Sequence, residues 1–293
     1  MRYESENIQI LSYLYQVIPQ KDAAFLGILL VLTLLACDRR LVIREYTKDI
    51  GSNSAPIRAA LITDLHNSRY GMSQHQLLNA IESQHPDIIL ISGDLFDDSD
   101  SHKNTEAFLA GISHKYPCYY VTGNHEHRHG PESFAIRMSI LEKYGITILD
   151  GAFETIEING ACLNLGGVSD PAAYLSQYEQ PTVSFEEQLQ AVSTASENGN
   201  YTVLLSHRPE YFDRYCQYGF DLVLCGHAHG GQWRIPYLLN GLYAPGQGLF
   251  PKLAGGEYHD SGTTMIVSRG LQRGKSIVPR IFNRPELVII NLI

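Results

Sequence analysis

The sequence predicts a layered α/β fold, because strand-like and helix-like segments alternate along most of it. Five short apolar runs have the length and composition of buried strands, and they are Ala59 to Thr63, Ile88 to Ser92, Tyr119 to Thr122, Val203 to Ser206 and Leu222 to Cys225. Near-continuous apolar runs suit strands that are covered on both faces. We therefore expect a sheet with helices packed against it.

Segments with helical periodicity lie between these runs. In the first of them, Leu77, Leu78 and Ile81 fall on one helical face. The predicted helices are Gln74 to Gln84, Thr105 to Ser113, Pro131 to Tyr144, Phe185 to Glu197 and Glu210 to Tyr218. After His229 helix signals become sparse, and short strands are predicted at Thr263 to Ser268 and Leu287 to Leu292.

The stretch from Gly230 to Gly262 is unusually apolar for a loop. Its aromatic residues and leucines include Trp233, Tyr237, Leu238 and Phe250. Two interpretations remain open at this stage. The stretch forms a lid or a lipid-facing lip beside the site, or its side chains complete the core.

Length and composition agree with one enzyme-sized domain. We divide the 293 residues into an N-terminal segment, 1–55, and a domain, 56–293. A net charge of -9 argues against nucleic acid as the main partner, because phosphate backbones are bound by basic surfaces. The five cysteines are odd in number and scattered in spacing, which favours free thiols.

The N-terminal segment contains an apolar run from Ala23 to Cys37, which predicts an apolar helix. It is shorter than the roughly 20 residues that a spanning helix needs, so we expect a short membrane anchor or an interfacial helix, with a buried packing helix as the alternative. More positive charges follow the run than precede it, which predicts a membrane-associated protein with a cytoplasmic catalytic domain. A rival interpretation takes Leu34-Leu35-Ala36-Cys37 as a lipoprotein cleavage site, which places the enzyme outside.

Polar clusters follow the five apolar runs at once. They are Asp64-Leu65-His66, Gly93-Asp94, Gly123-Asn124-His125-Glu126, His207 and Gly226-His227-Ala228-His229. Ligands of open α/β sheets bind beyond the carboxyl ends of the strands, so these side chains are expected to meet at one place. We expect the glycines at 93, 123 and 226 to allow the backbone angles that turn each ligand into the site. Together the clusters form a ligand set for two metal ions.

The ordered motifs D-x-H, GD, GNHE, H and GHxH resemble the calcineurin-like dimetal phosphoesterase (metallophosphoesterase) family, from about Ile57 to the C-terminus. Gly230-Gly231-Gln232-Trp233 and the segment from Pro279 to Leu287 resemble its small, membrane-associated bacterial branch. That branch includes phosphodiesterases and resembles UDP-2,3-diacylglucosamine pyrophosphate hydrolases. The resemblance implies a four-layer sandwich, in which two mixed β-sheets pack face to face and helices lie outside.

The resemblance also implies roles for the clustered residues. Asp64, His66, Asp94 and His229 would bind one metal ion, and Asp94, Asn124, His207 and His227 would bind the other, with Asp94 as the bridge. Mixed nitrogen and oxygen ligands without thiolate favour Mn, with Fe, Zn, Ni or Co as alternatives. His125 is the expected general acid, and Arg208 is a candidate contact to phosphate.

The expected reaction is hydrolysis of a phosphodiester or pyrophosphate bond by a metal-bridging hydroxide. A lipid-linked, phosphorylated small molecule is the favoured substrate class. Two alternatives are a soluble nucleotide-type substrate and a non-catalytic metal-binding scaffold.

Residues 125–129 also satisfy the H-E-x-x-H pattern of zinc proteases, which requires a helix that places both histidines on one face. Gly123-Asn124 before the pattern and Gly130-Pro131 after it leave no room for that helix. We therefore expect His127 and His129 to be loop residues without a metal. Histidines outside the clusters are expected to be structural, although His102 could line the rim of the site.

Overall fold

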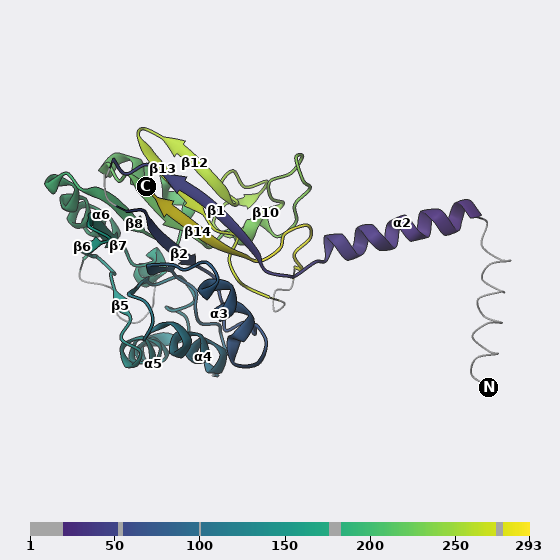
Figure 1. The fold of residues 1–293 in the computed structure, drawn as a ribbon, viewed down its shortest axis with the longest axis horizontal. Helices are drawn as coiled ribbons and strands as arrows, with labels where there is room; N and C mark the ends of the chain where they lie inside the picture. The colour runs from purple at the N-terminus through teal and green to yellow at the C-terminus, as the bar shows by residue number, and fades with distance from the viewer. Residues whose placement is uncertain (1–19, 52–54, 100, 176–182, 274–277) are drawn as a thin grey trace.

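The computed structural model describes residues 20–51, 55–99, 101–175, 183–273 and 278–293. Two six-stranded sheets form the centre of the molecule. Helices cover their outer faces, with α3, α4 and α5 on one side of the molecule and α6 on the other (Figure 1). The predicted α/β fold of two mixed sheets flanked by helices is confirmed.

The first sheet carries strands from both ends of the chain. Its spatial order is β1 (Val42–Lys48), β14 (Glu286–Leu292), β2 (Ile57–Ile62), β3 (Ile88–Ser92), β4 (Cys118–Val121) and β5 (Thr147–Ile148). β2 to β5 are parallel, whereas β14 runs antiparallel to β2. The helices against its outer face are α3 (His75–Glu82), α4 (Lys103–Ile112) and α5 (Gly130–Lys143).

The second sheet is parallel in its middle and antiparallel at both edges. Its order is β12 (Gly256–Asp260), β13 (Thr263–Val267), β9 (Leu222–Cys225), β8 (Tyr201–Leu205), β7 (Ala161–Gly167) and β6 (Ala152–Ile158). Its outer face packs against α6 (Phe185–Ser193) and α7 (Phe212–Tyr215). A separate hairpin joins β10 (Tyr243–Ala244) to β11 (Gly248–Leu249).

Strand β2 contributes side chains to the apolar layers on both faces of its sheet. Ala59 and Leu61 pack into the apolar layer between the sheets, while Ala60 and Ile62 pack under the helices. Successive side chains of a strand point to opposite faces, so a continuous apolar run fills both layers. The polar clusters predicted from sequence come just after the carboxyl ends of β2, β3, β4, β8 and β9.

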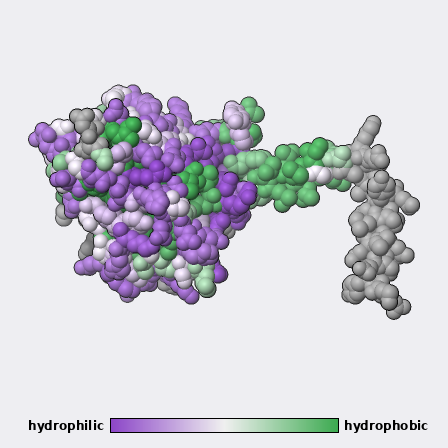
Figure 2. All heavy atoms as spheres, in the orientation of Figure 1, coloured by the Kyte–Doolittle hydropathy of each residue, from purple (hydrophilic) through white to green (hydrophobic). Residues whose placement is uncertain are grey.

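The N-terminal helix α2 (Gln20–Ala36) projects from the sandwich (Figure 1), and its surface is apolar (Figure 2). Its side chains are not buried against the domain, since Phe25 and Leu34 are each 65 % exposed. The alternative of a buried packing helix is therefore wrong. The next element, β1, lies within residues 1–55 and pairs with β14, and the predicted division into domains remains a prediction.

The predicted localisation is contradicted. In the described part of the chain, no helix is long and apolar enough to cross a membrane. The expectation of a membrane-spanning anchor, with the catalytic domain on either side of the membrane, is therefore corrected.

The apolar stretch after His229 does not complete the core with all of its side chains. Tyr237, Leu238, Leu249 and Phe250 are largely exposed, whereas Ala244 and Ala254 are buried. The interpretation that this stretch completes the core is thus wrong for these four large side chains. The five cysteines are free thiols, as predicted.

Candidate metal centre

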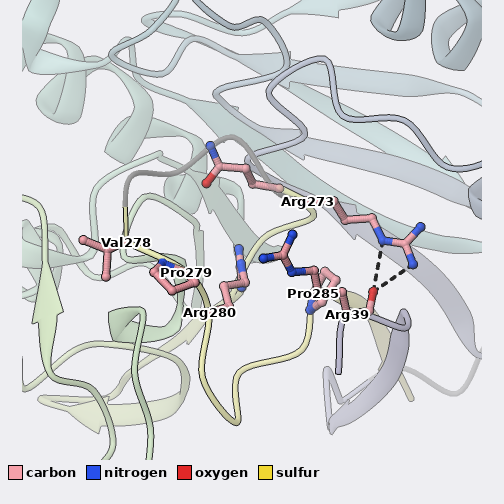
Figure 3. A pocket seen from close by; sticks show the side chains of 7 residues that line it. Arg39, Arg273, Val278, Pro279, Arg280 and Pro285 are labelled. Atoms are coloured by element: carbon pink, nitrogen blue, oxygen red, sulfur yellow. Dashed lines mark hydrogen bonds between the residues drawn. The ribbon is translucent and has the colours of Figure 1, made fainter. Parts of the chain in front are cut away.

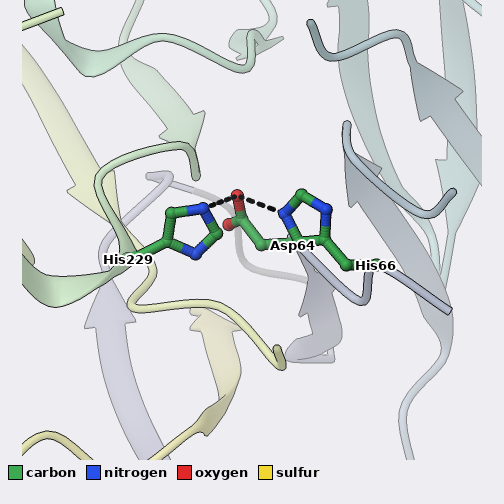
Figure 4. A group of neighbouring side chains, drawn as sticks. All are labelled: Asp64, His66 and His229. Carbon is green, nitrogen blue, oxygen red and sulfur yellow. Dashed lines mark ion pairs between the residues drawn. The ribbon is translucent and has the colours of Figure 1, made fainter. Parts of the chain in front are cut away.

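Three side chains from two strand ends form the first group of possible metal ligands. Asp64 and His66 follow β2, and His229 follows β9. The Asp64 carboxylate lies between the two imidazoles, at 4.0 Å from His66 Nε2 and 3.8 Å from His229 Nε2 (Figure 4). All three are buried, and their ligand atoms lie within 4.8 Å of one another. One cation could contact all three.

A second group forms around Asp94, which follows β3. Asp94 Oδ2 lies 3.2 Å from His207 Nε2, and His207 Nε2 lies 3.2 Å from His227 Nδ1. The same Asp94 oxygen lies 3.4 Å from Nε2 of His66, which belongs to the first group. Asp94 therefore stands between the two groups, where a carboxylate with several lone pairs can serve two cations.

In the described part of the chain, buried polar atoms without a hydrogen-bond partner indicate that these residues fit metal ions. They are both ring nitrogens of His66, Asp94 Oδ2, Asn124 Oδ1, His227 Nε2 and His229 Nδ1. A buried polar atom without a partner costs about 1–3 kcal/mol. So many at one place would be costly in an apolar core, whereas divalent cations would satisfy several of them. Imidazole, carboxylate and amide ligands without thiolate suit Mn, Fe, Zn, Ni or Co.

The electrostatics of the group also suit cation binding. Burial lowers the pKa of His66 and that of His229 to about 3, so both imidazoles are neutral and keep a lone pair. Burial also works against a charged His207, but the neighbouring Asp94 carboxylate raises the pKa of His207 to about 10. The Nδ1 of His207 donates to the Ser92 carbonyl oxygen at 2.8 Å, which directs Nε2 to Asp94. A divalent cation would take the place of the proton there.

The backbone at these residues is strained. Asp64, His66, Asp94, His227 and His229 all have φ between 45° and 65°. Non-glycine residues adopt this left-handed region at a cost of about 1–3 kcal/mol each, and such residues cluster at functional sites. Each of these residues lies in the segment that follows its strand.

The role predicted for the glycines is right for one of them. Gly93 has φ of 80°, as expected for a turn. Gly123 and Gly226 do not have positive φ; instead a Cβ at Gly123 would lie 2.3 Å from Asp94 Oδ1, and one at Gly226 would lie 2.5 Å from Asp64 Oδ2. These two glycines allow close approach of the backbone to a carboxylate.

The candidate general acid, His125, lies beside the metal centre. Its backbone N–H donates to Asp94 Oδ1 at 2.9 Å, and its ring makes an edge contact with His66 at 4.5 Å between centroids. Its Nδ1 lies 3.1 Å from Asp98 Oδ1, which orients the ring. A hollow lined by His66, Asp97, Asp98, Ser99, His125 and Gln272 opens over it.

Comparison with known proteins gives this geometry a context. Residues 57–231 match the family described as calcineurin-like phosphoesterases. The chain belongs to this family. It is therefore a hydrolase of the metallophosphoesterase type, and the family binds divalent metal ions. The resemblance predicted from the ordered motifs is confirmed.

Two relatives and one solved structure are similar to this chain. The chain is 28% identical over 260 residues to phosphodiesterase YaeI of Escherichia coli (strain K12), covering 86% of this chain and 88% of YaeI. It is 24% identical over 237 residues to the uncharacterized metallophosphoesterase YkuE of Bacillus subtilis (strain 168), covering 78% and 77%. NAD nucleotidase of Haemophilus influenzae has a similar fold, with a TM-score of 0.52 at 14% identity over 75% of this chain and 46% of that one.

Two residues to which the sequence analysis gave no role hold the loops of this phosphoesterase in place. The buried Glu126 carboxylate accepts hydrogen bonds from the backbone N–H groups of Asp94, Gly123 and Phe96. Arg137 of α5 donates from Nη1 to the carbonyl oxygens of His125, Glu126 and Arg128. The GNHE motif was a signal for Glu126, but nothing in the sequence marks Arg137.

Arg208, the candidate phosphate contact, is already held by carboxylates. Its Nε and Nη2 donate to Asp170 at 2.7 and 3.0 Å, and its Nη1 lies 3.3 Å from Glu210 Oε1. Glu210 in turn lies 3.7 Å from His227 Nε2. The contacts favour a role in supporting Glu210 and His227, and the predicted phosphate contact remains a prediction.

The H-E-x-x-H alternative does not apply to this phosphoesterase. Residues 125–129 form turns, and α5 begins only at Gly130. His127 stacks on Phe134, and His129 lies 3.4 Å from Asp98. His102 contacts Phe96 and lines a neighbouring hollow together with Asp98 and His129.

Proposed function

We propose that this chain hydrolyses a phosphodiester or pyrophosphate bond at a centre of two divalent cations. Asp64, His66, Asp94 and His229 would hold one cation, and Asp94, Asn124, His207 and His227 would hold the other. The observation that carries the proposal is the position of Asp94 Oδ2, within 3.4 Å of His66 Nε2 and 3.2 Å of His207 Nε2. When bound, two such cations acidify water and neutralise charge on the phosphoryl oxygens.

The residues around the cations account for the remaining steps. His125 donates a proton to the departing oxygen, which avoids the release of a strongly basic alkoxide. Asp98 accepts from Nδ1 of His125 and so leaves Nε2 to face the substrate. Arg128 binds the second oxygen of Asp98 at 2.9 Å and keeps that carboxylate in place.

Removal of the metal ions tests the proposed function. We expect the purified full chain to hydrolyse bis(p-nitrophenyl) phosphate, to lose this activity after treatment with a chelator, and to recover it with added Mn²⁺. Release of p-nitrophenolate and metal content are measured on the same samples. A metal-loaded chain that hydrolyses no diester or pyrophosphate would instead favour a non-catalytic metal-binding scaffold.

The substrate that we propose is a lipid-linked molecule, and a soluble nucleotide-type molecule is the alternative. It is supported by the exposed apolar side chains of the loop that follows His229. Tyr237 and Leu238 are 107% and 85% exposed, although large apolar side chains usually lie inside. These side chains would contact an acyl chain while the phosphate occupies the metal centre.

An acylated and a deacylated diester of the same head group distinguish these substrates. We expect kcat/KM to be about tenfold higher for the acylated one, the effect of burying about two methylene groups. The substitutions Tyr237→Ser and Leu238→Ser should reduce this preference, whereas Met72→Ser, at another exposed apolar residue, should not. Equal kcat/KM values for both diesters would favour a soluble nucleotide-type substrate.

A further inference from the structure

A second hollow, beside the metal centre, is lined by three arginines. Its lining residues are Arg39, Gln272, Arg273, Val278, Pro279, Arg280 and Pro285 (Figure 3). None of these described residues is acidic, although the chain as a whole carries a net charge of -9. Positive charge is therefore concentrated here against the general charge of the protein.

Arg280 is the most unusual of the three. Its side chain is only 7% exposed, and Nη2 donates to the Arg269 carbonyl oxygen at 2.7 Å. Among the described residues, its Nη1 is buried and has no hydrogen-bond partner. Burial lowers the pKa of Arg280 to about 10, so the group stays charged at neutral pH. A buried charged donor without a partner is costly, and an anion would satisfy it.

Arg39 and Arg273 are the other two arginines that line this hollow. Arg273 lies over the Tyr70 ring at 4.4 Å and donates to the Arg39 carbonyl oxygen at 2.8 and 3.0 Å. These contacts hold the backbone of Arg39, whose exposed side chain points toward Arg280 across the hollow (Figure 3). Like charges brought together repel one another unless an anion lies between them.

The hollow adjoins the metal centre through two residues. Gln272 lines both this hollow and the one over His125. Gly270, whose carbonyl oxygen lies 3.5 Å from Arg280 Nη2, packs so closely on the metal-ligand candidate Asp64 that a Cβ there would lie 2.6 Å from Asp64 Cβ. A substrate bound at the metal ions could therefore extend into the arginine hollow.

We propose that this hollow binds a second phosphate group of the substrate, in addition to the phosphate that is cleaved at the metal centre. The proposal rests on the function proposed above and narrows its substrate class to molecules with two phosphate groups. Arginine forks match phosphate oxygens in geometry and charge. The hollow as it stands admits about one water molecule, so the exposed Arg39 side chain turns outward when the phosphate binds.

Two p-nitrophenyl diesters test this inference on the Mn²⁺-loaded full chain. One is thymidine 5′-(p-nitrophenyl phosphate), and the other is the same compound with an added 3′-phosphate. We expect kcat/KM to be at least about tenfold higher for the compound with the second phosphate, the scale of one charge-assisted hydrogen bond. Arg39→Ala and Arg280→Gln should each reduce this ratio at least about threefold.

Arg214→Ala is the matched control, because Arg214 is an exposed arginine that pairs with Glu186 and lines neither hollow. It should leave the ratio unchanged. If Arg280→Gln fails to fold, as judged by circular dichroism, Arg39→Ala still decides. A ratio near one in the wild type, or an unchanged ratio in Arg39→Ala, overturns the inference. Hydrolysis of neither compound by a wild-type chain that does hydrolyse bis(p-nitrophenyl) phosphate also overturns the inference, whereas hydrolysis of none of the three compounds overturns the proposed function.

Discussion

Asp94→Asn is expected to lower the metal content of both sites and to reduce kcat by at least about two orders of magnitude. One oxygen of Asp94 faces His66 and His207, and the other accepts the backbone N–H of His125. The amide has nearly the same shape, so it keeps the packing, but it removes the negative charge that would attract two cations. Metal content by mass spectrometry and the rate of diester hydrolysis measure the effect.

Asp213→Asn is the control for Asp94→Asn, because Asp213 is an exposed carboxylate on α7. It should change neither metal content nor rate. Retention of two ions by Asp94→Asn with activity close to that of the wild type would show that Asp94 is not a bridge.

His125→Ala is expected to keep both metal ions and to lose about 10²–10⁴-fold in kcat on substrates with poor leaving groups. The imidazole lies beside the metal centre but is oriented by Asp98, so it can donate a proton without binding a cation. With p-nitrophenolate as the leaving group the loss should be smaller, because that anion needs less protonation. The two losses are compared between an alkyl diester and a p-nitrophenyl diester.

The control for His125→Ala is His259→Ala, at an exposed histidine on β12. It should affect neither substrate. Equal losses of kcat by His125→Ala on both diesters would contradict the general-acid role and leave His125 as a residue that positions phosphate.

Most strands that carry the candidate ligands could be predicted from sequence. Ile88–Ser92 and Leu222–Cys225 were predicted with the bounds that β3 and β9 have. Both faces of these strands are buried, and the resulting continuous apolar run is a strong local signal. The helix predicted from Glu210 to Tyr218 is instead broken into α7 and two short 3-10 helices, because its length is decided by packing on the second sheet.

The edge strand β6 and its neighbour β7 were not predicted, although a local signal existed. Asn159 and Gly160 connect them, with φ of 52° and 82°. Asn-Gly with positive φ at both positions is the preferred two-residue turn of a hairpin. The sequence signal for β6 itself was weak, because most of its side chains are exposed and only one of its faces meets the core.

Residues that contact the site residues from far away in sequence could not be predicted. Asp98 lies 27 residues from His125 in sequence, and Asp170 lies 38 residues from Arg208. Arg280 lies beside Asp64 only because the segment after β13 folds back over the ends of β2 and β9. A charged residue in a loop looks the same in sequence whether it is solvated or buried beside a metal ligand.

The sequence by itself determined the family of this protein, the strand ends that carry its polar clusters, and the ligand types available for metal ions. These properties are local, because an apolar run and the residues that follow it are read from neighbouring positions. Only the tertiary structure decided that Asp98 orients His125, that Arg208 pairs with Asp170, and that α2 projects from the domain. These features depend on contacts between segments far apart in sequence, which form only when the two sheets pack together.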